Sequence, residues 1–147
     1  MTIEEFVTKV QAIAEAEDTY NKDYEFFCGL VADYNKNKKI SDIIILLPPK
    51  EWPLNWRSGC FYDVEIEFMI GRVAELRDNR DDTYPYAEIR DELNEDAVTF
   101  LGALNTDGST LVLQTDIMGS YFSNSEGPTV NSQEFLKFPV TVRLWST

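Results

Sequence analysis

Residues 61–71 read Phe-Tyr-Asp-Val-Glu-Ile-Glu-Phe-Met-Ile-Gly, and this stretch decides the fold. From 62 to 70 every even position is Tyr, Val, Ile or Phe, whereas the odd positions begin with Asp63, Glu65 and Glu67. Because successive side chains of a β-strand point to opposite faces, the alternation predicts a half-buried strand over residues 62–70, with one apolar and one acidic face. A helix through the same residues would scatter the three carboxylates around its circumference.

Before this stretch, the sequence predicts one helix and two strands. Thr2 and Glu5 form a capping box at the start of an apolar stripe, so residues 3–17 are expected to be helical. Residues 24–31 are compatible with a short strand or a helical turn, and we favour the strand. Residues 43–47 are a continuous apolar run, which is typical of a strand buried on both faces.

After it, the sequence predicts a second helix over residues 85–104, with a proline in its first turn. Its buried stripe consists of Ile89, Leu93, Ala97, Phe100, Leu101 and Leu104. The carboxylates that we expect to face water are Glu88, Asp91, Glu92, Glu95 and Asp96. Strands follow over residues 110–118 and 138–145, and residues 119–134 are expected to form a long polar loop.

The order of these elements predicts the fold class. Helix, strands, helix and strands in succession indicate an α+β fold. We expect one domain over residues 1–147, with a mainly antiparallel sheet of about four to five strands and two helices packed on one face. A chain of 147 residues can bury roughly 70% of its unfolded surface, so this core needs no disulfide or metal.

Composition excludes several classes of function. The chain contains no histidine, which removes Ser-His-Asp and Cys-His catalysis and histidine-ligated metals. A net charge of −13 argues against general nucleic-acid binding and against anionic membranes. No run of about 20 apolar residues predicts a membrane span. The acidic first residues lack the basic region of a signal peptide, so we expect the product to stay in the cytoplasm where it is made. Cys28 and Cys60 are interpreted as buried free thiols.

The row of Asp63, Glu65 and Glu67 is the first candidate site. Neighbouring carboxylates in such a row stand roughly 6.5–7 Å apart, a separation that inverting glycosidases also use. A catalytic pair, however, needs one acid in an apolar pocket, whereas all three would share one wet surface. We therefore interpret the row as a solvated or interface face. We expect no enzyme, no catalytic residue, no bound metal and no cofactor.

Two loops and two pairs of aromatic residues complete the candidate list. Residues 77–82 superficially suggest a calcium loop but lack its third-position oxygen ligand and its glycine, and residues 35–39 are expected to be a basic turn. Trp52 and Trp56 lie beside prolines and suit a ligand platform, the edge of a sheet or an interface. Tyr121 and Phe122 lie in the expected long loop and suit contacts with another subunit.

Taken in order, these elements resemble those of phage tail terminator and tail-completion (head–tail joining) proteins. In that family a first helix and a short strand precede a loop-rich stretch, a long strand of the kind seen here as VEIEFMI, a helix and a last pair of strands. The resemblance covers nearly the whole chain and rests on the order of elements rather than on a motif. It implies a viral structural protein in the virion tail or neck, forming a ring of identical subunits, commonly a hexamer.

The resemblance also implies partners and roles for the candidate residues. The ring would contact tail-tube or neck proteins, and it would end tube growth or join tail to head. Asp63, Glu65 and Glu67 would face an acidic channel through which DNA passes without specific binding, because like charges repel. The four aromatic residues named above would contact neighbouring subunits. Two alternatives remain: a small acidic inhibitor or adaptor that mimics DNA or docks on a basic protein, and an acid-based hydrolase using Glu65 and Glu67.

Overall fold

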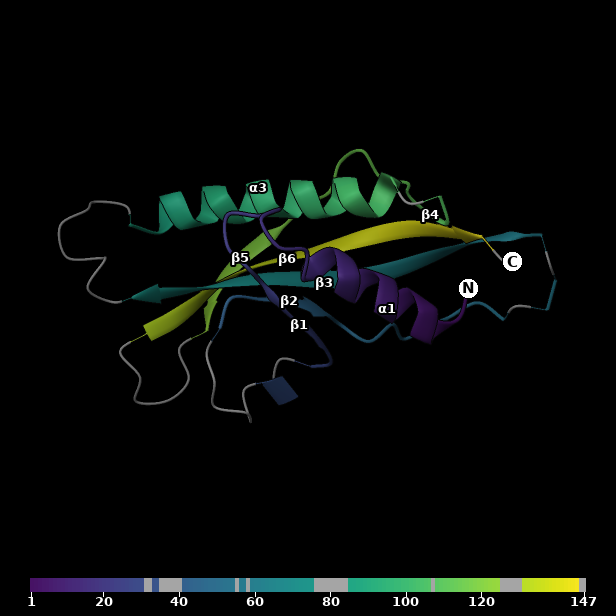
Figure 1. The fold of residues 1–147 in the computed structure, drawn as a ribbon, viewed down its shortest axis with the longest axis horizontal. Helices are drawn as coiled ribbons and strands as arrows, with labels where there is room; N and C mark the ends of the chain where they lie inside the picture. The colour runs from purple at the N-terminus through teal and green to yellow at the C-terminus, as the bar shows by residue number, and fades with distance from the viewer. Residues whose placement is uncertain are drawn as a thin grey trace.

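The computed structural model describes residues 1–30, 33–34, 41–54, 56–57, 59–75, 85–106, 108–124 and 131–145. Its elements are, in chain order, α1 (Ile3–Ala14), β1 (Glu25–Cys28), β2 (Ile43–Leu46), β3 (Phe61–Glu75), α3 (Pro85–Thr106), β4 (Thr110–Val112), β5 (Ser120–Asn124) and β6 (Asn131–Trp145). Helices α1 and α3 lie along one side of a long, twisted sheet (Figure 1). The predicted α+β class with two helices on one face is confirmed.

The sheet is built around the pairing of β3 with β6. These two strands of 15 residues each run antiparallel along their whole length, from Phe61 opposite Trp145 to Glu75 opposite Asn131. The strand order is β1-β2-β3-β6-β4, and β5 pairs with β6 as well. Among the described residues the sheet therefore has six strands rather than four to five. It is mainly antiparallel, as predicted, and only β1 and β2 are parallel within that part of the chain.

Helix α1 begins as the sequence predicts. The Thr2 hydroxyl accepts a hydrogen bond from Glu5 N at 3.1 Å, and the Glu5 carboxylate accepts one from Thr2 N at 3.0 Å, which is a complete capping box. The helix ends at Ala14 rather than at residue 17. The chain turns at Asp18, whose φ of 56° lies in the left-handed region. The Tyr20 hydroxyl then donates to a carbonyl oxygen of the last helical turn at 2.7 Å.

The main core lies between the two helices and the sheet. The even positions of β3 face it, so Val64, Ile66, Phe68 and Ile70 are buried, as predicted from the alternation. Their partners from the helices and from β6 are Phe6, Val10, Ala14, Leu93, Ala97, Phe100, Leu104, Leu136, Phe138, Val140, Val142 and Leu144. The predicted apolar stripe of α3 is thereby confirmed, and so is that of α1 except for Ile3, which is exposed.

A second apolar cluster lies on the outer face, by which we mean the face of the sheet turned away from α1 and α3. Its buried members are Tyr34, Ile43, Ile45, Met69 and Phe135. Strand β2 therefore contributes to both clusters and is buried on both faces, as its uninterrupted apolar sequence predicts. Gly71 of β3 lies beneath the Phe135 ring, where a Cβ atom would stand 2.3 Å from the ring carbon Cε1.

The strands after α3 differ from the prediction. The strand expected over residues 110–118 ends at Val112, because the Gln114 side chain, rather than a strand backbone, accepts the hydrogen bond of Thr141 N at 3.1 Å. The expected polar loop 119–134 instead contains β5 and the start of β6. The Ser, Asn and Gln residues of this segment have low strand propensity, so the sequence predicted a loop. The strand β5 is stabilised by its pairing with the edge of β6.

The prediction for one carboxylate of α3 is also wrong. Asp96 of α3 was expected to face water, but it is only 2% exposed. It accepts hydrogen bonds from Asn21 N at 2.9 Å and from the Tyr24 hydroxyl at 2.5 Å, so the chain after α1 covers it. The predictions for residues 35–39 and 77–82 fall outside the described residues. Within the described part, neither helix is long and apolar enough to cross a membrane.

Candidate functional site

The three carboxylates of β3 lie in one row on the outer face, as predicted, but β6 places cations beside them. Arg143 stands opposite Asp63 and donates to both of its carboxylate oxygens, at 2.8 and 3.2 Å. Lys137 Nζ lies 3.4 Å from Glu67 Oε2. Glu65, between them, stands opposite a threonine. The row is therefore part of a mixed-charge surface and is less acidic than the sequence of β3 suggests.

These cations were missed because they belong to another strand. Arg143 alternates with buried Val142 and Leu144, so the sequence of β6 does place it on a polar face. Only the register of β3 with β6, however, sets it opposite Asp63. The hydrogen bonds from Arg143 lower the pKa of Asp63 below its usual value.

A shallow hollow of about 1000 Å³ covers this part of the outer face. The segment Leu47–Pro53 forms one wall and Gln114 lies at the other, with all three carboxylates of the row between them. A general acid needs an apolar surrounding that raises its pKa, whereas Asp63 shows the opposite shift. Asp63, paired with Arg143, is therefore a poor candidate for a general acid.

The four predicted contact aromatics lie in four different places. Trp52 packs against Phe6 of α1, with 5.6 Å between ring centroids, and so belongs to the main core. Phe122 stacks on Phe135 at 5.3 Å and joins the cluster on the outer face. Trp56 and Tyr121 keep exposed surface. The role of all four in subunit contacts stays a prediction, and Trp56 and Tyr121 are best placed for it.

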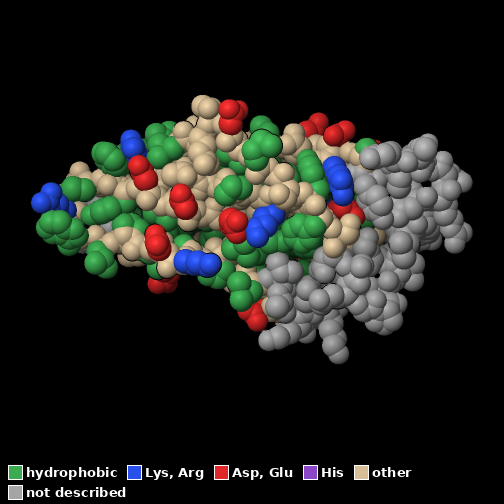
Figure 2. Space-filling view, turned by 180° about the vertical axis from the view of Figure 1, so that it is seen from behind, with side chains coloured by type: hydrophobic (Ala, Val, Ile, Leu, Met, Phe, Trp, Pro, Cys, Tyr) green, Lys and Arg blue, Asp and Glu red, His purple; other side chains and the backbone are tan. Residues whose placement is uncertain are grey.

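Trp56 belongs to an exposed tip, which we define as the apolar residues Leu54 and Trp56 together with Arg57. Leu54 is 80% exposed and Trp56 is 74% exposed. The Arg57 guanidinium lies 4.3 Å from the centroid of the Trp56 ring, a cation–π contact. The tip lies at the end of the molecule where β3 starts and β6 ends (right in Figure 1). Figure 2 shows hydrophobic and basic side chains together at this end, on the left in that view.

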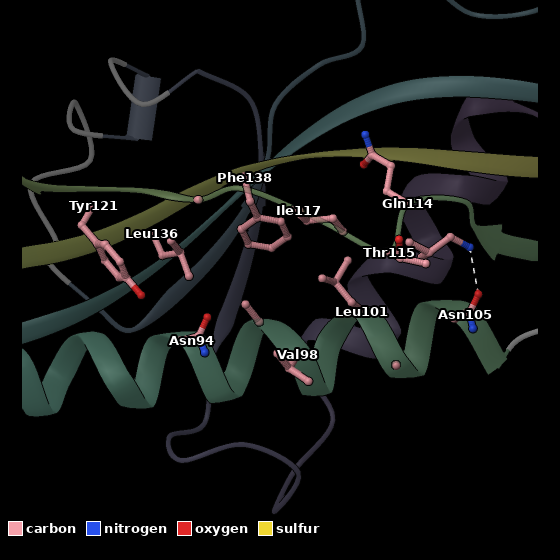
Figure 3. Close-up of a pocket in the computed structure, with 14 residues that line it drawn as sticks. Asn94, Val98, Leu101, Asn105, Gln114, Thr115, Ile117, Tyr121, Leu136 and Phe138 are labelled. Carbon is pink, nitrogen blue, oxygen red and sulfur yellow. Dashed lines mark hydrogen bonds between the residues drawn. The ribbon is translucent and has the colours of Figure 1, made fainter.

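Tyr121 belongs to an apolar groove of about 590 Å³ between α3 and the segment 112–121 (Figure 3). Val98 and Leu101 come from α3, Ile117 from the opposite wall, and Phe138 from the β6 floor. The walls are tied together at one end, where Asn105 Oδ1 accepts from Val112 N at 2.9 Å. At the other end the Tyr121 hydroxyl donates to a carbonyl oxygen of α3 at 3.3 Å. The groove was not predicted, because its outer wall was expected to be a strand.

A cluster of charges, of which Arg72, Asp96 and Glu134 are buried, lies between α3 and the end of the β3–β6 pair at Glu75 and Asn131. Arg72 of β3 forms an ion pair with Glu92, and Glu134 of β6, which is fully buried, lies 3.8 Å from Arg90. Asp96 lies in the same layer, next to two tyrosines. Burial and the Asp96 charge raise the pKa of Tyr20 to about 12, and burial together with the Asp96 hydrogen bond raises the pKa of Tyr24.

The described residues hold no group of three or more Cys, Asp and Glu side chains placed to bind a metal ion. Both cysteines are free thiols, but Cys28 is exposed rather than buried and Cys60 is half-buried. Cys28 is exposed because β1 lies at the edge of the sheet, where one face of the strand has little cover.

No protein-family model matches this chain, and no curated protein matches its sequence.

Proposed function

We propose that this chain is a structural protein of a phage tail or neck, of the tail-terminator or tail-completion type, and that it assembles into a ring around the DNA channel. The observation that carries the proposal is a strongly acidic subunit with exposed apolar surface at two separate places, the tip and the groove. Two different apolar patches suit a head-to-tail contact between identical copies, and such contacts generate rings when the rotation closes.

The net charge of −13 supports a channel that DNA crosses without being held. A basic lining would release counterions from DNA and bind it, whereas an acidic one repels it. Because β6 adds Lys137 and Arg143 to the outer face, the acidic lining rests mainly on other carboxylates. On α3, Glu88, Asp91 and Glu95 are exposed and follow at helical spacing.

Electron microscopy of tails from a phage with and without this gene tests the proposal. We expect overlong tubes, or heads and tails that fail to join, when the gene is removed. Expression of the protein from a plasmid should restore normal tails and serves as the control. Normal tails without the gene would overturn the assignment.

The second candidate is an acidic inhibitor or adaptor, and the exposed carboxylates of α3 favour it. Such a protein would act as a monomer and compete with DNA for a basic partner. Light scattering coupled to size-exclusion chromatography, together with a competition assay on isolated DNA-binding proteins of the host, separates the two functions. A ring without competition favours the tail protein, and a competing monomer favours the adaptor.

A further inference from the structure

We propose that the tip of one copy docks into the groove of the next copy, so that the ring is held together by a head-to-tail contact. This inference rests on the proposed function and specifies its interface. Trp56 and Leu54 would enter the groove between Val98 and Ile117, and Arg57 would pair with carboxylates at its rim.

The tip has the composition of an interface anchor. Leu54 and Trp56 are separated by one residue and follow Pro53, which restricts the backbone at their base. Both side chains are more exposed than any other tryptophan or leucine in the described part of the chain. Trp and Arg are enriched among the residues that dominate binding energy at interfaces. Because the Arg57 guanidinium lies on the face of the Trp56 ring, the tip presents both residue types in one protrusion.

The groove has the size and lining to receive such a protrusion. Its volume of about 590 Å³ lies in the range of sites that bind small organic groups, roughly 300–1000 Å³. Apolar side chains line its middle, whereas Asn94 and Gln114 lie nearer its borders (Figure 3). Val98, which lines the groove, is 62% exposed, and Met118, which lies between the lining residues Ile117 and Gly119 in the chain, is 82% exposed, so apolar surface is available for burial at and next to the groove.

Charge complementarity selects the tip as the occupant. Asp91 is exposed and precedes Val98 by two helical turns on the same face of α3, which puts it at the rim. Asp116 is exposed as well and lies between two residues that line the opposite wall, Thr115 and Ile117. An arginine at this rim, near an exposed carboxylate on each side, gains charge-assisted hydrogen bonds that a purely apolar side chain would not.

The two patches occupy different parts of the subunit. The tip lies where β3 starts (Figure 1), and the groove runs along α3 beside the segment 112–121 (Figure 3). A contact between them is therefore heterologous: each copy offers its tip to one neighbour and its groove to another. Such a contact does not end at a dimer, and it gives a ring when the rotation between neighbouring copies closes.

Directed disulfide formation tests the contact. In a background with Cys28→Ser and Cys60→Ser, one protein carries Leu54→Cys and a second carries Met118→Cys; both keep Trp56 and Arg57. Oxidation of the mixture at high concentration should give a covalent pair containing one copy of each variant. Each variant alone should give little. Ile3→Cys, another partly exposed apolar position, is the matched control and should not pair with either.

Three outcomes would overturn the contact: no mixed disulfide, a yield equal to that with Ile3→Cys, or efficient pairing of Leu54→Cys with itself, which would indicate a symmetric contact. A charge exchange gives a second measurement. Arg57→Glu should weaken association about tenfold or more, and Asp91→Arg added to it should restore part of the loss. Equal association by wild type and Arg57→Glu contradicts the pairing. Circular-dichroism melting checks that each variant is folded.

The result separates this contact from the phage assignment. If the mixed disulfide forms and tails are normal without the gene, the contact stands and the assignment fails. If tails are abnormal without the gene but the mixed disulfide does not form in the assembled ring, the assignment stands and the contact fails.

Discussion

The two halves of the β3–β6 pair have opposite polarity. In the near half, residues 61–67 with 139–145, the apolar side chains face the helices and the charges lie on the outer face. In the far half, residues 69–73 with 133–137, Met69 and Phe135 form a buried cluster on the outer face, and Arg72 and Glu134 lie under α3. Lys137, at the junction with the near half, remains on the outer face beside Glu67. The alternation of side chains continues without a break, but the face that carries charge changes near Ile70.

The surroundings of the two halves explain the reversal. In the far half, Tyr34 and the side chains of β1 and β5 cover the outer face, so that face excludes water. Under α3 in the same half, Arg72 and Glu134 are buried but have opposite charges nearby. Buried charges are tolerated when they are paired. The pattern of a strand therefore fixes which residues share a face, and the covering elements decide which face is dry.

The largest expected loss of unfolding free energy follows from a charge placed on either buried face of β3. We expect Ile66→Asp in the near half and Met69→Asp in the far half each to cost several kcal/mol, about 4 or more, because each buries an unpaired carboxylate. The two positions lie on opposite faces of β3, so equal costs would confirm that both faces contain core. Urea denaturation followed by fluorescence measures the free energy of unfolding.

Glu65→Gln is the matched control, on the outer face of the near half. It should cost less than about 0.5 kcal/mol, because an exposed residue without special contacts rarely contributes more. A cost for Met69→Asp close to that of Glu65→Gln would contradict the reversal of polarity.

The next effect concerns the close packing at the start of the far half. Gly71→Ala should cost about 3 kcal/mol, the upper end of the range for overpacking, because the new methyl group would overlap the buried Phe135 ring. Gly102→Ala on exposed α3 is the control. Its Cβ would meet no atom within 4 Å, so we expect a gain of up to about 1 kcal/mol. Thermal melting of both variants distinguishes a loss from a gain.

A smaller loss is expected from the charged layer of the far half. Asp96→Ala removes the acceptor of the buried Tyr24 hydroxyl and of Asn21, which should cost about 2 kcal/mol. Glu88→Ala, at an exposed position of the same helix, should leave the free energy of unfolding within about 0.5 kcal/mol of wild type. Similar values for both variants would show that the buried layer contributes nothing to stability.

The smallest effect appears only in alkali. The pKa of Tyr20 is raised from its usual 10.0 to about 12 in the folded chain, so the unfolded chain loses this proton first as pH rises. Stability from this group is complete below pH 10.0 and is lost toward pH 12. We expect Tyr20→Phe to flatten part of the decline in unfolding free energy over that interval. An unchanged slope would show that Tyr20 does not cause it.

Local sequence was enough for elements whose partners lie nearby in the chain or whose pattern is long. The capping box at Thr2, the buried stripe of α3 and the alternation in β3 needed no knowledge of the rest of the fold. Strand β5 was missed because Ser120–Asn124 is polar and is stabilised by pairing with β6 rather than by its own propensity. The groove was missed because the segment after Val112, which forms its outer wall, was expected to continue as a strand.

What the sequence determined by itself is the α+β class, the faces of β3 and the strongly acidic character of the subunit. Each depends on periodicity or composition, which are properties of the chain alone. The tertiary structure decided that Arg143 and Lys137 stand beside the acidic row, that Asp96 is buried and that Trp52 packs inside while Trp56 stays exposed. These depend on strand register and on which segment covers which face, and both are set by contacts between residues far apart in the sequence.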